Sequence, residues 1–103
     1  MSEQFTEEQQ NQLLFMMLIK QHQQIAKMGL GLESNPTTGE VEKDLKSARF
    51  AIDTLHMLHR YTKGNLNKEL SEFLDSTLNE LKVGLENADS TDTSENGSGS
   101  DQT

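Results

Sequence analysis

The segment TKGNL, residues 62–66, separates two helical patterns in the middle of the chain. Gly64 is suited to the left-handed conformation that commonly follows the end of a helix, and Asn65 lies beside it in the same turn. Leu66 can fold back onto the apolar residues of the preceding helical turn. Asn67 can cap a new helix, since its side chain can accept a backbone N–H of the first turn. TKGNL therefore predicts a tight turn that joins two antiparallel helices.

The helices on either side of this turn are predicted from the spacing of apolar residues. Upstream, residues 40–63 place one set on a single face of a helix, namely Val41, Leu45, Ala48, Ile52, Leu55, His59 and Thr62. Downstream, residues 67–87 carry one apolar stripe, namely Leu70, Phe73, Leu74, Leu78, Leu81 and Leu85. Phe50 and Met57 lie seven residues apart on the far side of the upstream helix, where they predict a second contact.

A further helix is predicted over residues 6–28, with Thr6 as its cap. Its centre, LLFMMLI at residues 13–19, is apolar around the whole circumference, and such a helix is usually buried on every side. A chain of 103 residues has little else to surround it. We therefore expect a homo-oligomeric bundle, most simply a two-fold dimer, rather than a monomer with exposed apolar surface. The expected interaction residues are Leu14, Phe15, Met17, Leu18, Phe50 and Met57.

The segment NPTTGE, residues 35–40, joins the first predicted helix to the second. Pro36 fixes its own φ and keeps Asn35 out of the helical region, while Gly39 can adopt dihedrals that other residues avoid. With Thr38, these residues make a sharp corner. A phosphate-binding loop would carry several glycines and usually a lysine, whereas this stretch has one glycine and no lysine. A structural turn is therefore favoured over a ligand site.

Composition limits the classes of function. The formal charge is −8 and no basic patch is present, which disfavours nucleic acid and anionic membrane surfaces as partners. The longest apolar run has seven residues, whereas a membrane span needs about 20. Without cysteine or a cationic leader, the chain is expected to be cytoplasmic. We predict a helical domain over residues 1–87 and a disordered acidic tail over residues 88–103, which is rich in Ser, Thr and Gly.

One group of residues on the predicted middle helix raises the possibility of chemistry. Asp53, His56 and His59 follow a D-x-x-H-x-x-H spacing, and carboxylate with imidazole can hold zinc. On a helix His59 points about 120° away from Asp53, so the three side chains do not converge. The alternative hypothesis is a ligand-binding, metal-binding or catalytic site around Arg49, Asp53 and His56, completed between subunits by Thr38 and Asn65. We favour a non-enzymatic protein-interaction module without a metal or cofactor.

The stretch NPTTGEVEKDLKSARFAIDTLHMLHRYTKGNLNKEL resembles a bacterial family known as domain of unknown function 1844, over about residues 15–85. The matching positions are Asn35, Pro36, Thr38, Gly39, Glu40, Asp44, Leu45, Ala48, Arg49, Ile52, Asp53, Leu55, Leu58 and Thr62 through Leu66. Tyr61 stands where the family usually has Lys, which puts in doubt any role that needs a cation there. Asn67 replaces Thr and keeps the capping ability. The resemblance implies a family but no specific function.

Overall fold

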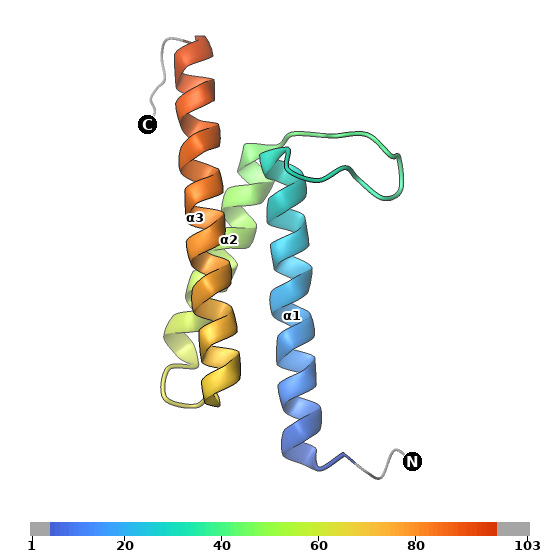
Figure 1. The fold of residues 1–103 in the computed structure, drawn as a ribbon, viewed down its shortest axis with the longest axis vertical. Coiled ribbons are helices and arrows are strands. Elements are labelled where there is room, and N and C mark those ends of the chain that lie inside the picture. The colour runs from blue at the N-terminus through green and yellow to red at the C-terminus, as the bar shows by residue number, and fades with distance from the viewer. Residues whose placement is uncertain (1–4, 97–103) are drawn as a thin grey trace.

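The computed structural model describes residues 5–96, which form three α-helices (Figure 1). Helix α1 spans Glu7–Leu30, α2 spans Leu45–Tyr61, and α3 spans Lys68–Asn96. The chain runs along α1, returns along α2 and reverses again into α3, and each helix packs against the other two. Within the described residues there is no β-strand. The prediction of an all-α fold of three helices with a hairpin is confirmed.

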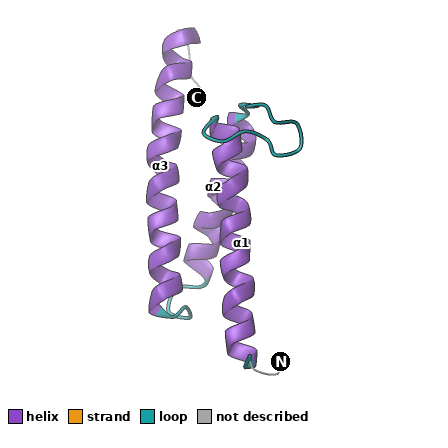
Figure 2. Cartoon of the chain, turned by 45° about the vertical axis from the view of Figure 1, so that its right-hand side comes forward, coloured by secondary structure: helices purple, strands orange, loops and turns teal. Residues whose placement is uncertain are grey.

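A short turn joins α2 to α3 (Figure 2). It is closed by backbone hydrogen bonds. The Thr62 N–H donates to the Leu58 carbonyl at 3.0 Å, and the Asn65 N–H donates to the Thr62 carbonyl at 2.8 Å. Gly64 has φ 85°, a left-handed conformation that favours glycine. The Asn67 side chain then accepts the Leu70 N–H at 2.8 Å, so it caps α3.

Helix α1 is capped at both ends by local sequence. The Thr6 hydroxyl accepts the Gln9 N–H at 3.0 Å, while the Gln9 side chain accepts the Thr6 N–H at 3.0 Å. This reciprocal arrangement is a capping box, which satisfies two backbone donors of the first turn. At the other end Gly31 has φ 84°, and its N–H donates to the Met28 carbonyl at 3.0 Å. The helix therefore ends two residues after the predicted Met28.

The core lies where the three helices meet. Ile19 of α1, Leu55 of α2, and Leu74 and Leu81 of α3 are the largest fully buried side chains. Smaller residues fill the space between them, and the full set of buried apolar residues is Ile19, Ala26, Leu30, Ala48, Ala51, Ile52, Leu55, Leu70, Leu74, Leu78, Leu81 and Ala88. Burial of such side chains supplies most of the driving force for folding.

Helix α2 begins at Leu45, five residues later than the predicted residue 40. The prediction was wrong because residues 40–44 take part in the loop that leads away from α1. Within that loop the Glu42 carboxylate accepts hydrogen bonds from Asn35 and Thr38. Asp44 is the N-cap of α2, and its backbone N–H donates to the Gly29 carbonyl at 2.8 Å. Residues 40–44 therefore make hydrogen bonds to residues earlier in the chain and do not form a helical turn.

Helix α3 continues to Asn96, nine residues past the end that its apolar stripe predicts. Residues 88–96 of the predicted acidic tail are thus helical, with Ala88 buried against the core. The rest of the predicted tail, residues 97–103, lies outside the described residues, as do residues 1–4. None of the described helices is long and apolar enough to cross a membrane.

Candidate functional site

The apolar segment at residues 13–19 is only partly covered by the rest of the fold. Ile19 is fully buried, whereas Leu13 is 45% exposed and Leu14 and Met17 are each 55% exposed. The remaining three residues of the segment, Phe15, Met16 and Leu18, are half-buried. The two companion helices therefore shield one side of this segment and leave a contiguous apolar face in water. We call this face, formed by Leu13, Leu14 and Met17, the α1 patch.

The unequal helix lengths leave the N-terminal end of α1 without a neighbouring helix α2. At 1.5 Å per residue, the 24 residues of α1 extend about 36 Å, whereas the 17 residues of α2 extend about 26 Å. The C-terminal end of α1 is held beside the start of α2, so its N-terminal end reaches past the turn that joins α2 to α3 (Figures 1 and 2). The first turns of α1 therefore have fewer neighbours than its second half.

A second apolar strip lies on the outer side of α2. Phe50 is 75% exposed, Met57 is 43% exposed and Tyr61 is 75% exposed. Spacings of seven and four residues place the three side chains on one helical face, opposite the buried Leu55. Phe50 and Met57 were predicted from the sequence as a contact surface, whereas Tyr61 was not. The four-residue spacing from Met57 was the signal that could have revealed it.

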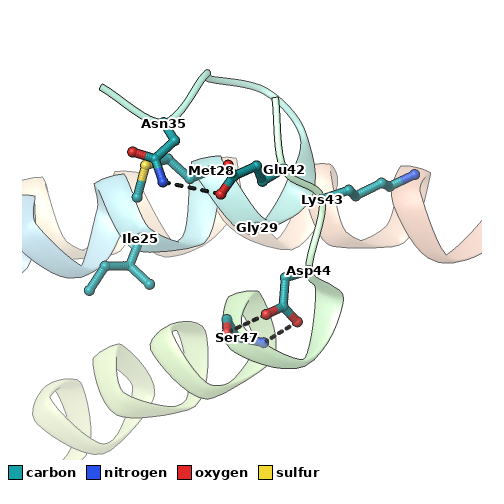
Figure 3. A pocket seen from close by; sticks show the side chains of 8 residues that line it. All are labelled: Ile25, Met28, Gly29, Asn35, Glu42, Lys43, Asp44 and Ser47. Atoms are coloured by element: carbon teal, nitrogen blue, oxygen red, sulfur yellow. Dashed lines mark hydrogen bonds between the residues drawn. The ribbon is translucent and has the colours of Figure 1, made fainter. Parts of the chain in front are cut away.

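The loop between α1 and α2 is organised by its own polar side chains (Figure 3). The Asn35 amide donates to Glu42 Oε1 at 3.1 Å, and the Thr38 hydroxyl donates to Glu42 Oε2 at 3.0 Å. Asn35 Oδ1 also accepts the Thr37 N–H at 2.8 Å. Gly39 has φ 77°, and its N–H donates to the Asn35 carbonyl at 2.7 Å. The polar groups of NPTTGE are thus engaged in shaping the loop.

An open pocket of about 380 Å³ lies between this loop, the end of α1 and the start of α2 (Figure 3). Its lining residues are Ile25, Met28, Gly29, Asn35, Glu42, Lys43, Asp44 and Ser47. The Ser47 hydroxyl donates to Asp44 at 2.8 Å and the Ser47 N–H donates at 3.2 Å, which together lower the pKa of Asp44. The carboxylates of Glu42 and Asp44 both accept hydrogen bonds from side chains of the same chain.

The residues of the alternative hypothesis do not assemble within one subunit. Arg49, Asp53 and His56 are exposed on α2. Thr38 lies in the loop that precedes α2, while Asn65 lies in the turn that follows it, so the two are at opposite ends of this helix. Among the described residues, no three His, Asp or Glu side chains are grouped so that they could hold a metal ion.

Polar contacts join α3 to its neighbours at Asp75 and at Glu80. His59 Nε2 on α2 lies 2.8 Å from Asp75 Oδ1, so this histidine pairs with a residue of α3 rather than with Asp53. On the other side, the Lys27 ammonium lies 3.0 Å from Glu80 Oε2 and the Gln23 amide donates to Glu80 Oε1 at 3.0 Å. These donors, the Lys27 contact above all, lower the pKa of Glu80. The Asp75 contact links α3 to α2, and the Glu80 contacts link α3 to α1.

The comparison with protein families gives one result. The model of the family described as Domain of unknown function (DUF1844) matches residues 12–87, which include all of α2, most of α1 and the turn motifs at residues 35–40 and 62–66. No curated protein and no solved structure matches the chain. Because the match extends over most of its length, the chain belongs to the family of unknown function DUF1844.

Proposed function

We propose that this protein is a non-enzymatic protein-interaction module that associates with itself through the α1 patch. The observation that carries the proposal is the exposure of Leu13, Leu14 and Met17 in an apolar segment that also contains the buried Ile19. Removing apolar surface from water is favourable by about 25 cal/mol per Å². A second molecule that covers these three side chains would therefore gain stability that the single subunit leaves unused.

The grouping of these side chains distinguishes them from scattered surface residues. Single exposed apolar residues are common in soluble proteins, but contiguous patches mark sites of interaction. Leu13, Leu14 and Met17 lie within one turn of the same helix, and the half-buried Leu18 adjoins them along the chain. Methionine suits such a contact because its flexible side chain adapts to an opposing surface.

The strip of Phe50, Met57 and Tyr61 on α2 provides a separate surface. Phenylalanine, methionine and tyrosine are enriched at protein interfaces. A two-fold dimer closed through the α1 patch leaves this strip available to another protein, which is the further partner that we propose. We also infer a cytoplasmic setting, which is supported by a fold that relies on apolar packing in a chain without cysteine.

Sedimentation equilibrium of the full chain and of a Leu14→Glu variant tests this function. The wild-type chain is expected to be a dimer at micromolar concentration, and the added charge should weaken association by about tenfold or more, because it would be buried in the contact. Leu32→Glu is the matched control, since Leu32 is 58% exposed but lies outside the α1 patch. Circular dichroism verifies that both variants keep their helices. A folded wild-type monomer over the whole micromolar range would refute the proposal.

A further inference from the structure

We propose that two copies of the chain pair through the first half of α1 in antiparallel orientation, with the two-fold axis midway between Leu14 and Met17. This inference rests on the proposed self-association and specifies its geometry. It commits to one occupant of the α1 patch, which is the same segment of a second copy.

The exposed face of α1 has a pattern that is symmetric about this midpoint. Gln10, Leu14, Met17 and Gln21 are all exposed, and their spacings of four, three and four residues keep them on one face of the helix. An antiparallel two-fold pair places Leu14 of one copy opposite Met17 of the other. It places Gln10 opposite Gln21, where the two amides can exchange hydrogen bonds at the rim of the contact. The apolar pair is central and the amides enclose it, as in a typical interface.

The charges along α1 favour the antiparallel orientation. Glu7 and Glu8 lie in its first turn, whereas Lys20 lies in its second half and is exposed. A parallel pair would bring the acidic ends of both copies together and would also bring the two Lys20 side chains to the same level. The antiparallel pair instead sets the acidic end of each copy alongside the half of its partner that carries Lys20. Complementary charge of this kind selects orientation and register more than it adds affinity.

The shape of the subunit agrees with this arrangement. The N-terminal end of α1 reaches past the α2–α3 turn, so the first half of the helix can lie against another helix (Figures 1 and 2). In the antiparallel pair the two α2–α3 hairpins lie toward opposite ends of the paired helices. The contact is isologous and closes on itself, since the same patch is used by both copies. Binding of the α1 patch to the α2 strip of another copy would be heterologous, and its repetition could form open chains.

The absence of cysteine from the chain allows a direct test by disulfide formation. Gln10→Cys and Gln21→Cys are made as separate single-cysteine variants of the full chain, one of them with an affinity tag so that products differ in mass. In the proposed dimer, residue 10 of one copy lies opposite residue 21 of the other. Two copies of residue 10 lie about 16 Å apart along the helix axis, which is too far for a disulfide. Lys46→Cys, an exposed position on α2, serves as the control.

The expected result is a mixed disulfide between the two variants, in about tenfold excess over disulfides within either variant alone. Disulfides only between identical variants would indicate a parallel pair and overturn the inference, while leaving the proposed self-association intact. A dimer by sedimentation that forms neither kind of disulfide would place the contact elsewhere, which also overturns it. A monomer by sedimentation would overturn both the geometry and the proposed function. Thermal unfolding by circular dichroism checks that each variant is folded.

Discussion

Gly29 of α1 and Ala48 of α2 meet at a point where a methyl group on the glycine would have no space. A Cβ on Gly29 would lie 2.6 Å from the Asp44 carbonyl oxygen and 3.0 Å from Ala48 Cβ. The Gly29 carbonyl at the same point accepts the Asp44 N–H at 2.8 Å. The end of α1 and the start of α2 are therefore in backbone contact, and this contact sets how far each helix extends beyond the other.

We predict that Gly29→Ala lowers the free energy of unfolding by about 1–3 kcal/mol. The added methyl group would push against backbone atoms, which cannot move aside as a flexible side chain can. Urea denaturation monitored by circular dichroism measures the change. Gly84→Ala is the matched control, because Gly84 is also helical and its added Cβ would meet only the ends of Leu30 and Leu32. There the better helix propensity of alanine should offset the tighter contact. An equal loss of stability in the two variants would contradict the close backbone contact at Gly29.

Leu55 and Phe50 lie on the same helix but are predicted to contribute very differently to stability. Leu55 is fully buried, so Leu55→Ala should lower the free energy of unfolding by about 2–5 kcal/mol through the cavity that it leaves. Phe50 is 75% exposed, so Phe50→Ala should change stability by less than about 0.5 kcal/mol. Denaturant unfolding of both variants measures the two changes. The protein concentration is chosen so that the variants and the wild type have the same oligomeric state. A large loss for Phe50→Ala would mean that this side chain is covered.

Thr77 is a buried polar residue on the inner face of α3, with 2% of its surface exposed. Its hydroxyl makes no hydrogen bond to the part of the chain that the structure describes. Because a buried hydroxyl without a partner is unfavourable, Thr77→Val should raise the free energy of unfolding by about 1 kcal/mol. Thr54→Val is the control, since the Thr54 hydroxyl donates to the Phe50 carbonyl at 2.8 Å. A loss of stability in Thr77→Val would instead indicate that the hydroxyl has a partner.

The contact of Glu80 with Lys27 and Gln23 predicts a pH dependence. Lys27 and Gln23 lower the pKa of Glu80 in the folded state. The Glu80 carboxylate therefore stabilises the fold when the pH is above the ordinary pKa of a glutamate side chain. This contribution is lost as the pH falls through the lowered folded pKa. Glu80→Gln should therefore destabilise the protein at neutral pH by about 0.5 kcal/mol, a small value because the side chain is 47% exposed.

Urea unfolding at neutral pH and at about pH 3 tests this prediction, and the difference between wild type and Glu80→Gln should shrink at the lower pH. Glu72→Gln is the control, because Glu72 is exposed on α3 without an ion pair to another described residue. A difference of the same size at both values of pH would show that charge on Glu80 is not the cause.

The three helices and the capping signals at several of their ends could be predicted from local sequence, whereas the start of α2 and the end of α3 could not. The turn at residues 62–66 was predicted from Gly64 and Asn67, and both act in the structure through their own backbone or side chain. Thr6 was predicted as a cap for the same reason, since its partner Gln9 is three residues away. Caps and turns of this kind can be predicted from a sequence because the interacting groups are neighbours along the chain.

The candidate site was only partly predictable. The excess of apolar residues in LLFMMLI was evident from composition, but which of them are exposed depends on the lengths of α1 and α2 and on where they touch. Tyr61 was assigned to no surface until the strip with Phe50 and Met57 was seen. The partner of His59 was not predicted, because Asp75 belongs to another helix, sixteen residues away.

The sequence by itself therefore determined three helices, the caps at Thr6 and Asn67 and the presence of two turns, because each depends on residues within a few positions of one another. Tertiary structure alone decided that residues 40–44 are not helical, since Glu42 bonds to Asn35, seven residues earlier, and Asp44 to Gly29, fifteen residues earlier. It also decided which side of α1 remains in water. Burial is a property of the surfaces that other helices present, and no local pattern specifies those surfaces.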